Sequence, residues 1–349
     1  MKILHTSDWH LGHTLYNYDR TAEQQAFLRQ LTRIVTEEQP DAMVVSGDIY
    51  HYSSPAAATQ KMYTDAMLNI HQACPGMAIV VTAGNHDSSS KLEIDSSLWQ
   101  HFGLNVVGNI ERTAEEVNLD KHIIEVKNGQ ETKGYVIAVP HVYPQNFPLL
   151  DTETPRDQRQ TRFFQALLDE VKKRNTAQLP VVLMAHLSIE GSDRSGHDES
   201  IGGIEYVPLS AMGEGYDYLA LGHIHCPQDI KGSHHHARYC GTPLPVSFDE
   251  TYPHSVSIIE LEKGAEPQIS TREIENPIPL VTLPHDPTPF EDALKLLEEY
   301  PEEKPAYLRL NVLTKGYLPP TATKKPRTPP KARHANIATS RLPRAAGRH

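Results

Sequence analysis

Short apolar runs alternate with amphipathic segments along the first half of the chain. The apolar runs span six or seven residues and stop abruptly at polar residues, as is typical of buried strands. The segments between them carry apolar residues three or four positions apart, as is typical of helices packed on a sheet. The pattern therefore predicts an α/β fold with a buried sheet. The predicted strands are 2–7, 41–46, 77–82 and 179–185, and the predicted helices are 20–38, 56–71 and 156–173.

Strand-like runs recur as far as residue 261, and the composition then changes near Asn276. Residues 277–313 predict a small separate β-α-β unit with an amphipathic helix at 289–300. From Gly316 onward the chain is rich in Pro, Lys, Arg, Thr and Ala and poor in large apolar residues. Such a segment buries too little surface to offset its ordering entropy, so we predict that it is disordered. The predicted divisions of the chain are 1–275, 276–317 and 318–349.

Length and composition limit the class of protein. A chain of 349 residues is long enough for two domains. No uninterrupted apolar stretch approaches the roughly 18–20 residues of a membrane helix, and the N-terminal MKILHTSD turns polar too soon for a secretion signal. The three cysteines show no paired-motif spacing, which argues against a disulfide framework. We expect a soluble chain in the reducing cytoplasm, without a membrane partner.

The charge is unevenly distributed. Residues 304–349 hold 11 of the 33 Lys and Arg residues and none of the 44 Asp and Glu residues, so the preceding residues carry a net charge of −22. An acidic body is not typical of nucleic-acid binding, which relies on Lys and Arg to neutralise phosphates. It is compatible with metal-binding carboxylates and a solvated surface.

Five polar clusters follow predicted strands, each at the C-terminal end of its strand. Ligands bind at this edge in open α/β sheets. In Asp8-x-His10 and His223-x-His225 the paired side chains are two residues apart, which places them on the same side of an extended backbone. The clusters are SDWH (7–10), GDIYH (47–51), GNHD (84–87), AH (185–186) and GHIH (222–225).

The donor atoms in these clusters are carboxylates, imidazoles and an Asn carbonyl, with no thiolate. This set suits manganese, iron or zinc and disfavours a Cys-rich structural zinc site. There are enough ligands for two ions, and a pair of ions roughly 3.5–4 Å apart is a known device for phosphoester hydrolysis. One carboxylate must then bridge both ions, and we choose Asp48 because it follows the central-looking strand 41–46.

Each cluster also has a structural interpretation. A single His at a strand end is usually just hydrogen-bonded, and Gly84, Asn85 and Asp87 would also suit a turn. Five clusters in this order, each after a predicted strand, make chance a poor explanation, so we favour the metal site. The triple histidine 234–236 is expected in a solvated hairpin loop. The histidines without motif support are His5, His13, His71, His141 and His197.

The order D-x-H, G-D, G-N-H-D, a single His and G-H-x-H resembles the signature of calcineurin-like metallophosphoesterases. Within them, the SbcD family of nuclease subunits from bacterial SbcCD complexes is similar over residues 1–315. The resemblance implies a four-layer α-β-β-α sandwich followed by a small α+β capping domain, partial here at 276–317. The stretches that carry it are MKILHTSDWHLG, VVSGDIY, TAGNHDS, AHLSIEGSDRSG, LALGHIHCPQ and YCGTPLPVSFDE.

The resemblance implies a role for each residue of the clusters. His86 resembles the family's catalytic histidine, which assists departure of the 3′ oxygen, and Asp87 is expected to orient its imidazole. His51 is expected to lie behind the metal ligands or to contact phosphate. Asp48 is shared between two ions. The remaining implied ligands are Asp8, His10 and His225 for the first ion and Asn85, His186 and His223 for the second.

The function that the resemblance implies is manganese-dependent hydrolysis of DNA, as a 3′–5′ exonuclease on duplex ends and an endonuclease on hairpins and single strands. It places the chain in DNA recombination, replication and repair, with an SbcC-type coiled-coil ATPase partner and a homodimer of nuclease subunits. Two alternatives stay open. One is a two-metal phosphodiesterase for a small molecule, which the acidic body fits. The other is a non-catalytic DNA-end scaffold, against which the complete ligand set argues.

The chain departs from the family pattern near Leu318. The family continues there with a further strand and helix of the capping domain and a segment that docks on the SbcC coiled coil. The residues that stand in their place have no helical apolar stripe and no acid. We expect a frameshift or truncation, with a basic arm that contacts DNA phosphates as the rival hypothesis. Cleavage chemistry should survive this change, whereas docking to SbcC should be altered.

Overall fold

The computed structural model describes residues 1–112, 116–196, 206–301, 303–313, 333–336 and 339–340. It divides into two compact units. The first consists of Met1–His13 and Gln24–Glu275, and the second of Thr14–Glu23 and Asn276–His349. The proposed catalytic clusters all belong to the first unit. Among the described residues, no helix is both long enough and apolar enough to span a membrane.

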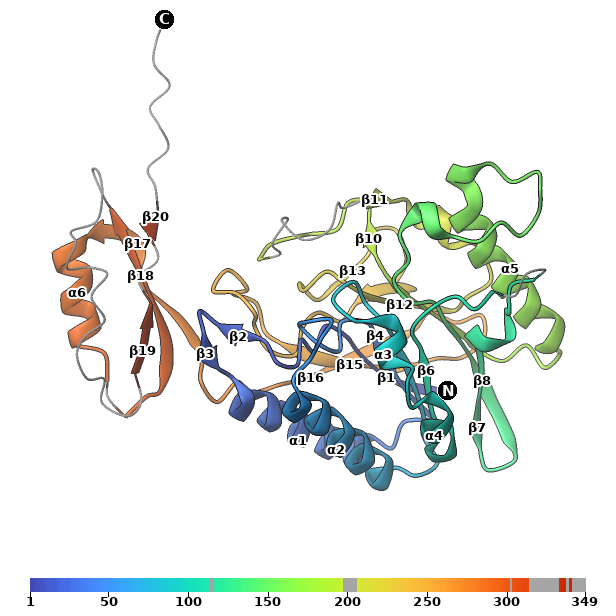
Figure 1. The fold of residues 1–349 in the computed structure, drawn as a ribbon, viewed down its shortest axis with the longest axis horizontal. Coiled ribbons are helices and arrows are strands. Elements are labelled where there is room, and N and C mark those ends of the chain that lie inside the picture. Colours follow the sequence, from blue (N-terminus) through green and yellow to red (C-terminus); the bar gives the residue numbers. More distant parts are fainter. Residues whose placement is uncertain (113–115, 197–205, 302, 314–332, 337–338, 341–349) are drawn as a thin grey trace, which may run out of the picture. The chain divides into compact units, whose positions relative to one another are not determined.

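Two six-stranded sheets form the first unit (Figure 1). One has the order β16-β15-β1-β4-β5-β6 and the other the order β13-β14-β12-β9-β8-β7. The strands of the first sheet are β1 (Lys2–Thr6), β4 (Ala42–Ser46), β5 (Ala78–Thr82), β6 (Leu104–Val107), β15 (Ser255–Glu260) and β16 (Gln268–Glu273). Those of the second sheet are β7 (Ile123–Asn128), β8 (Glu131–Ala138), β9 (Val181–His186), β12 (Tyr218–Gly222), β13 (Gln228–Asp229) and β14 (Ala237–Tyr239). A separate short parallel pair joins β10 (Ser188–Ile189) to β11 (Tyr206–Val207).

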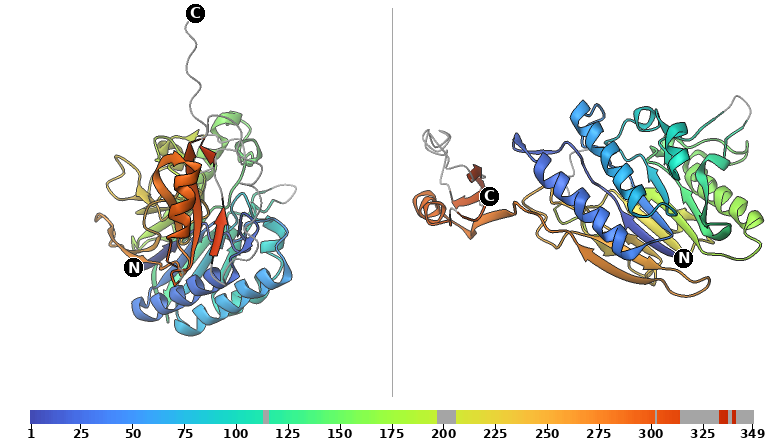
Figure 2. Two further views of the ribbon diagram at one scale, coloured as in Figure 1. Left: turned by 90° about the vertical axis from the view of Figure 1, so that its left-hand side faces the viewer. Right: turned by 90° about the horizontal axis from the view of Figure 1, so that it is seen from below.

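Helices cover the outer face of each sheet (Figures 1 and 2). The long helices α1 (Thr21–Glu38) and α2 (Ala57–Ala73) lie side by side and pack on the first sheet, and α5 (Arg159–Arg174) packs on the second. Each begins within three residues of its predicted start. The short helices α3 (Ser89–Leu92) and α4 (Ser96–Trp99) follow β5.

Alternation of side chains along the central strands builds three stacked apolar layers. On β4, Met43 and Val45 join the cluster beneath α1 and α2, whereas Val44 joins the cluster between the sheets. On β9, Leu183 packs towards α5 and Val182 packs between the sheets. Successive residues of a strand point to opposite faces, so continuous apolar runs are needed where both faces are buried. The predicted four-layer α-β-β-α sandwich is therefore confirmed.

The second unit is a small β-α-β element. Its strand β17 (Leu280–Pro289) pairs in parallel with β18 (Ala306–Leu313), and α6 (Phe290–Glu298) connects them. The hairpin β2 (Thr14–Leu15) and β3 (Tyr18–Asp19) belongs to the same unit. The Tyr307 hydroxyl of β18 donates a hydrogen bond to the Glu23 carboxylate at 2.9 Å, which links the two sequence segments of this unit.

Only two short parts of the predicted C-terminal tail are described. The strands β19 (Arg333–Asn336) and β20 (Thr339–Ser340) both pair in parallel with β18. The rest of the tail, 318–332, 337–338 and 341–349, lies outside the described residues, and its expected disorder stays a prediction. His234 and His235 lie in the turn between β13 and β14, as expected for a hairpin loop.

The buried His122 gives the first unit a specific sensitivity to acid. It packs against Phe163, and its Nδ1–H donates to the Ala138 carbonyl at 2.7 Å. Burial lowers the pKa of His122 to about 4. The unfolded chain takes up this proton near pH 6.5, so stability that is fully present above pH 6.5 is lost as the pH falls towards 4.

We expect the wild-type free energy of unfolding to fall by about 3 kcal/mol more than that of His122→Phe between about pH 7 and pH 4. Chemical denaturation across this pH range measures the difference. Substitution of the exposed His101 by Phe is the control and should leave the wild-type slope unchanged. Identical slopes for wild type and His122→Phe would contradict the expectation.

Candidate metal centre

The five polar clusters meet where the carboxyl ends of the two sheets come together. Asp8, Asp48 and Asn85 follow β1, β4 and β5 of the first sheet, whereas His186 and His223 lie at the ends of β9 and β12 of the second. Parallel neighbours within each sheet carry their strand ends to the same edge. Contacts of 3.8 Å or less then connect all seven predicted ligands into one group.

Four of the seven lie on backbone that L-amino acids rarely adopt. Asp8, His10, Asp48 and His223 have positive φ angles of 53°, 45°, 52° and 98°. A positive φ is uncommon outside glycine, and such conformations cluster at functional sites. Backbone hydrogen bonds from Asp8 N to the Gly47 carbonyl and from His10 N to the Asp48 carbonyl, both 3.0 Å, hold the first two loops together.

The first half of the centre contains Asp8, His10 and His225, which each offer one ligand atom within 4.8 Å of the other two. His225 donates its Nδ1–H to the buried carboxylate of Glu250 at 2.9 Å. Its Nε2 therefore presents a lone pair, and this atom lies 3.2 Å from Nε2 of His10. Two imidazole nitrogens at this distance need a proton or a metal cation between them.

The second half is built around the side-chain oxygen of Asn85. This Oδ1 lies 3.0 Å from Nε2 of His186 and 3.0 Å from Nδ1 of His223. His186 already donates its Nδ1–H to the Ser46 carbonyl at 2.8 Å, so in its neutral form Nε2 is an acceptor. Nε2 of neutral His186 and Oδ1 of Asn85 are then two acceptors that face each other at 3.0 Å. The residues present therefore fit a cation in each half.

Asp48 lies between the two halves. One carboxylate oxygen is 3.4 Å from Nε2 of His186 and 3.8 Å from Nε2 of His10. The other accepts a hydrogen bond from the His86 backbone N–H at 2.8 Å. Burial alone would raise the pKa of Asp48, but the His186 and His10 imidazoles outweigh it and hold the pKa well below its usual range. The carboxylate is therefore ionised between the two halves of the centre.

The electrostatics of the centre favour added positive charge. Burial works to lower the pKa of His186, but the Asp48 carboxylate outweighs it and raises that pKa to about 9. Burial likewise opposes the charged form of His225, and the Glu250 carboxylate reverses the effect, so that this pKa is raised. Burial lowers the pKa of His10 well below its usual range, whereas the carboxylates favour added positive charge at His186 and His225, where a divalent cation would be attracted by the same field.

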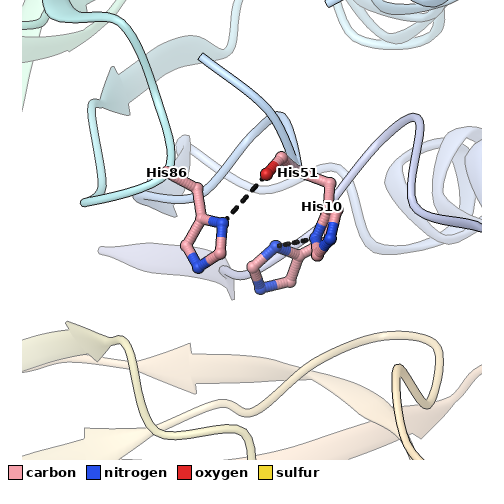
Figure 3. A group of neighbouring side chains, drawn as sticks. All are labelled: His10, His51 and His86. Atoms are coloured by element: carbon pink, nitrogen blue, oxygen red, sulfur yellow. Dashed lines mark hydrogen bonds between the residues drawn. The ribbon is translucent and has the colours of Figure 1, made fainter. Parts of the chain in front are cut away.

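His86 and His51 lie next to His10 (Figure 3). The ring of His86 is 4.9 Å from that of His10 and stacks on His51 at 5.3 Å, centroid to centroid. His86 donates its Nδ1–H to the His51 carbonyl at 2.9 Å, which leaves Nε2 as its reactive nitrogen. His51 Nδ1 lies 3.4 Å from Nδ1 of His10. Burial lowers the pKa of His51 to about 4.

Asp87 does not contact the His86 imidazole, contrary to expectation. Its carboxylate accepts hydrogen bonds from the backbone N–H groups of Gly84, Ile49 and Tyr50 at 2.9, 3.1 and 2.9 Å. Asp87 therefore joins the loop after β4 to the loop after β5. The carbonyl of His51 is the group that orients His86. Burial, and then the nearby Asp48 carboxylate, raise the pKa of Asp87 to about 7.

Two residues beside the centre were not predicted from the sequence. Glu250 holds His225, although it lies 25 residues away along the chain. His141, which follows β8, donates its Nδ1–H to the His186 carbonyl at 3.2 Å. Glu250 stands in the stretch YCGTPLPVSFDE, so its acidic residues were the available signal. Nothing in the sequence around His141 indicated its position.

The family model for calcineurin-like phosphoesterases matches residues 1–227. Three curated relatives each carry the name of the SbcD subunit of the nuclease SbcCD. The protein from Rhodobacter capsulatus is 34% identical over 309 residues, which cover 85% of this chain and 75% of the relative. This chain belongs to the SbcD family of calcineurin-like phosphoesterases. The Escherichia coli K12 relative is 30% identical over 91% of this chain and 79% of its own length, and the Bacillus subtilis relative is 33% identical over 76% and 68%.

Membership of the SbcD family confirms the resemblance that the motifs indicated. It also implies divalent-metal binding and hydrolysis of phosphoester bonds, in agreement with the converging acceptors described above. The identity of the metal and the role of each ligand are not settled by membership and stay predictions.

Glu250 provides a test of the first half of the centre. Its side chain is fully buried and also accepts a hydrogen bond from Thr242 Oγ1 at 3.0 Å. We expect Glu250→Gln to weaken metal binding by about 10–100-fold, because loss of the carboxylate removes the group that fixes the His225 ring and raises its basicity. Calorimetric titration with Mn²⁺ measures the change. The exposed Glu262→Gln is the control, and equal affinity in both variants would contradict this role.

Gly84 allows the loop after β5 to approach Asp48. A methyl group at this position would overlap the Asp48 carboxylate and its backbone nitrogen. We expect Gly84→Ala to lose about 1–3 kcal/mol of stability and to bind metal more weakly. Gly76→Ala is a matched control, since its added methyl group meets open space. Thermal unfolding and Mn²⁺ titration of both variants measure stability and metal affinity. Equal stability and equal affinity in Gly84→Ala and Gly76→Ala would refute the packing argument.

Proposed function

We propose that this chain is the SbcD-type nuclease subunit of an SbcCD complex and hydrolyses DNA phosphodiester bonds with two divalent ions, of which Mn²⁺ suits the carboxylate and imidazole donors best. The observation that carries the proposal is the pair of acceptor clusters on either side of Asp48. The relatives that carry the name of the SbcCD nuclease support DNA as the substrate.

Each half of the proposed centre has its own ligands. Two divalent ions bound there would supply the charge that polarises a phosphate and the activation of an attacking water. Asp48 is the shared ligand because it lies between the halves. The other proposed ligands are Asp8, His10 and His225 for one ion and Asn85, His186 and His223 for the other.

His86 is the proposed general acid for the leaving 3′ oxygen. Its Nδ1–H is engaged by the His51 carbonyl, so Nε2 is the atom from which a proton would pass to the substrate. The backbone N–H of His86 binds Asp48, which fixes the imidazole relative to the proposed metal ligands. His51 stacks on His86 and supports it from behind; a contact from His51 to phosphate is also proposed.

The expected cleavage reactions are 3′–5′ exonuclease action on duplex ends and endonuclease action on hairpins and single strands. An SbcC-type ATPase is the proposed partner, and the nuclease subunits are proposed to pair as a homodimer. Both follow from the names and family of the relatives, since the structure holds one chain. The cellular setting that fits this function is the cytoplasm, with activity at the nucleoid.

Two variants separate metal binding from proton transfer. We expect Asp48→Ala to abolish hydrolysis of a hairpin-ended DNA in Mn²⁺ and to lower the bound-metal content. His86→Ala should keep both ions and lose about 10²–10⁴-fold in kcat, because only the proton donor is removed. Elemental analysis and single-turnover cleavage measure these outcomes.

Loss of both ions from His86→Ala would overturn the proposed division of roles. A small chromogenic phosphodiester is assayed beside the DNA. Wild-type hydrolysis of the small diester without cleavage of DNA would favour the alternative function, a small-molecule phosphodiesterase.

A further inference from the structure

A cavity of about 370 Å³ opens beside the second half of the metal centre. Asn85 lines it, so the cavity adjoins a proposed metal ligand directly. His141 also lines it and is tied to the proposed ligand His186 through the hydrogen bond to the His186 carbonyl. The volume of the cavity lies within the range of small-ligand pockets and suits one nucleotide.

The cavity has a cation on its wall, although the body of the chain is strongly acidic. Among the described residues, Asp87 supplies the one lining carboxylate, and three backbone N–H groups already bind that carboxylate. Arg112 is an exposed cation on the wall, and its guanidinium is held by the Asn146 carbonyl. A guanidinium oriented in this way is suited to a phosphate oxygen.

An aromatic ring stands on the same wall. Tyr143 is 45% exposed, which is high for a large apolar side chain. Its ring contacts the His141 ring edge to face at 5.0 Å, which restrains the orientation of the Tyr143 ring. Exposed aromatic rings next to cationic groups bind nucleobases by stacking in single-strand-binding proteins.

A larger cavity in the second unit lacks these features. It measures about 570 Å³, and its lining includes the carboxylates of Asp286, Asp292 and Glu299. The Lys295 ammonium on its wall is engaged by Asp292 at 2.9 Å. This cavity therefore repels a phosphate, whereas the cavity beside Asn85 combines a cation, a stacking ring and a neighbouring metal ligand.

From this combination we propose that the cavity lined by Arg112, His141 and Tyr143 is a nucleotide subsite, which binds one nucleotide of the DNA strand adjacent to the bond that is cut. Arg112 binds the phosphate of that nucleotide, and Tyr143 stacks on its base. His141 is a positioning residue that connects the subsite to His186. The inference rests on the proposed nuclease function and adds the residues that distinguish a DNA strand from a small phosphodiester.

Binding of a fluorescent hairpin DNA in EDTA tests the subsite without bound metal or turnover. We expect Arg112→Gln and Tyr143→Ala each to raise Kd about ten-fold, since one stacked base or one phosphate contact is worth roughly this factor. Arg112→Gln should also reduce the slope of log Kd against log salt by roughly 0.7–0.9, as for one phosphate, whereas Tyr143→Ala should leave the slope unchanged. Tyr143→Phe keeps the ring and should restore affinity.

The control is Arg33→Gln on α1, an exposed arginine paired with Glu37, which should bind DNA like the wild type. DNA cleavage in Mn²⁺ is measured beside binding, and KM for DNA should rise more than KM for a small chromogenic diester. Wild-type affinity and salt slope in both Arg112→Gln and Tyr143→Ala would overturn the subsite while leaving the nuclease proposal intact. The converse result, a chain that binds DNA through Arg112 and Tyr143 but never cleaves it, would support the subsite and overturn the nuclease.

Discussion

The structure depends on buried hydrogen-bond acceptors that face one another at the junction of the two sheets. Asn85 Oδ1 lies 3.0 Å from Nε2 of His186, and Nε2 of His225 lies 3.2 Å from Nε2 of His10. Burying acceptors against each other is unfavourable unless positive charge lies between them. The raised pKa values of His186 and His225 show that added positive charge, here as a proton, is favoured at both imidazoles. Divalent-metal binding, which membership of the family implies, satisfies this requirement.

The packing of the sandwich holds these atoms in place. The apolar layer between the sheets, with Val44 and Val182 on facing strands, fixes the separation of β4 and β9 and therefore of Asp48 and His186. The strand ends then turn sharply, with positive φ at Asp8 and Asp48, so that side chains from different strands reach one point. Such strained loops persist only where packing and hydrogen bonds over-determine them. The three backbone hydrogen bonds to Asp87 are part of that support.

Much of the centre could be predicted from the sequence because the end of each buried strand is marked by an abrupt change from apolar to polar residues. The alternation of apolar runs and helices indicated the sheets, and the polar residues that follow each run indicated the shared edge. Glu250 and His141 could not be found in this way, since their contacts depend on tertiary packing rather than on spacing. The role of Asp87 was predicted wrongly because adjacency to His86 says nothing about side-chain direction, and its carboxylate turns towards backbone N–H groups instead. The sequence also did not predict that Thr14–Glu23 belong to the second unit. They join it through the hydrogen bond between Glu23 and Tyr307, which depends on tertiary packing.

The central claim is that the acceptors on either side of Asp48 hold two ions. Anomalous diffraction from crystals grown with Mn²⁺ tests it most directly, because the scattering peaks locate each ion independently of activity. Two peaks roughly 3.5–4 Å apart, both in contact with Asp48, are the expected result. A single peak, or none within reach of Asp48, would contradict the two-ion centre.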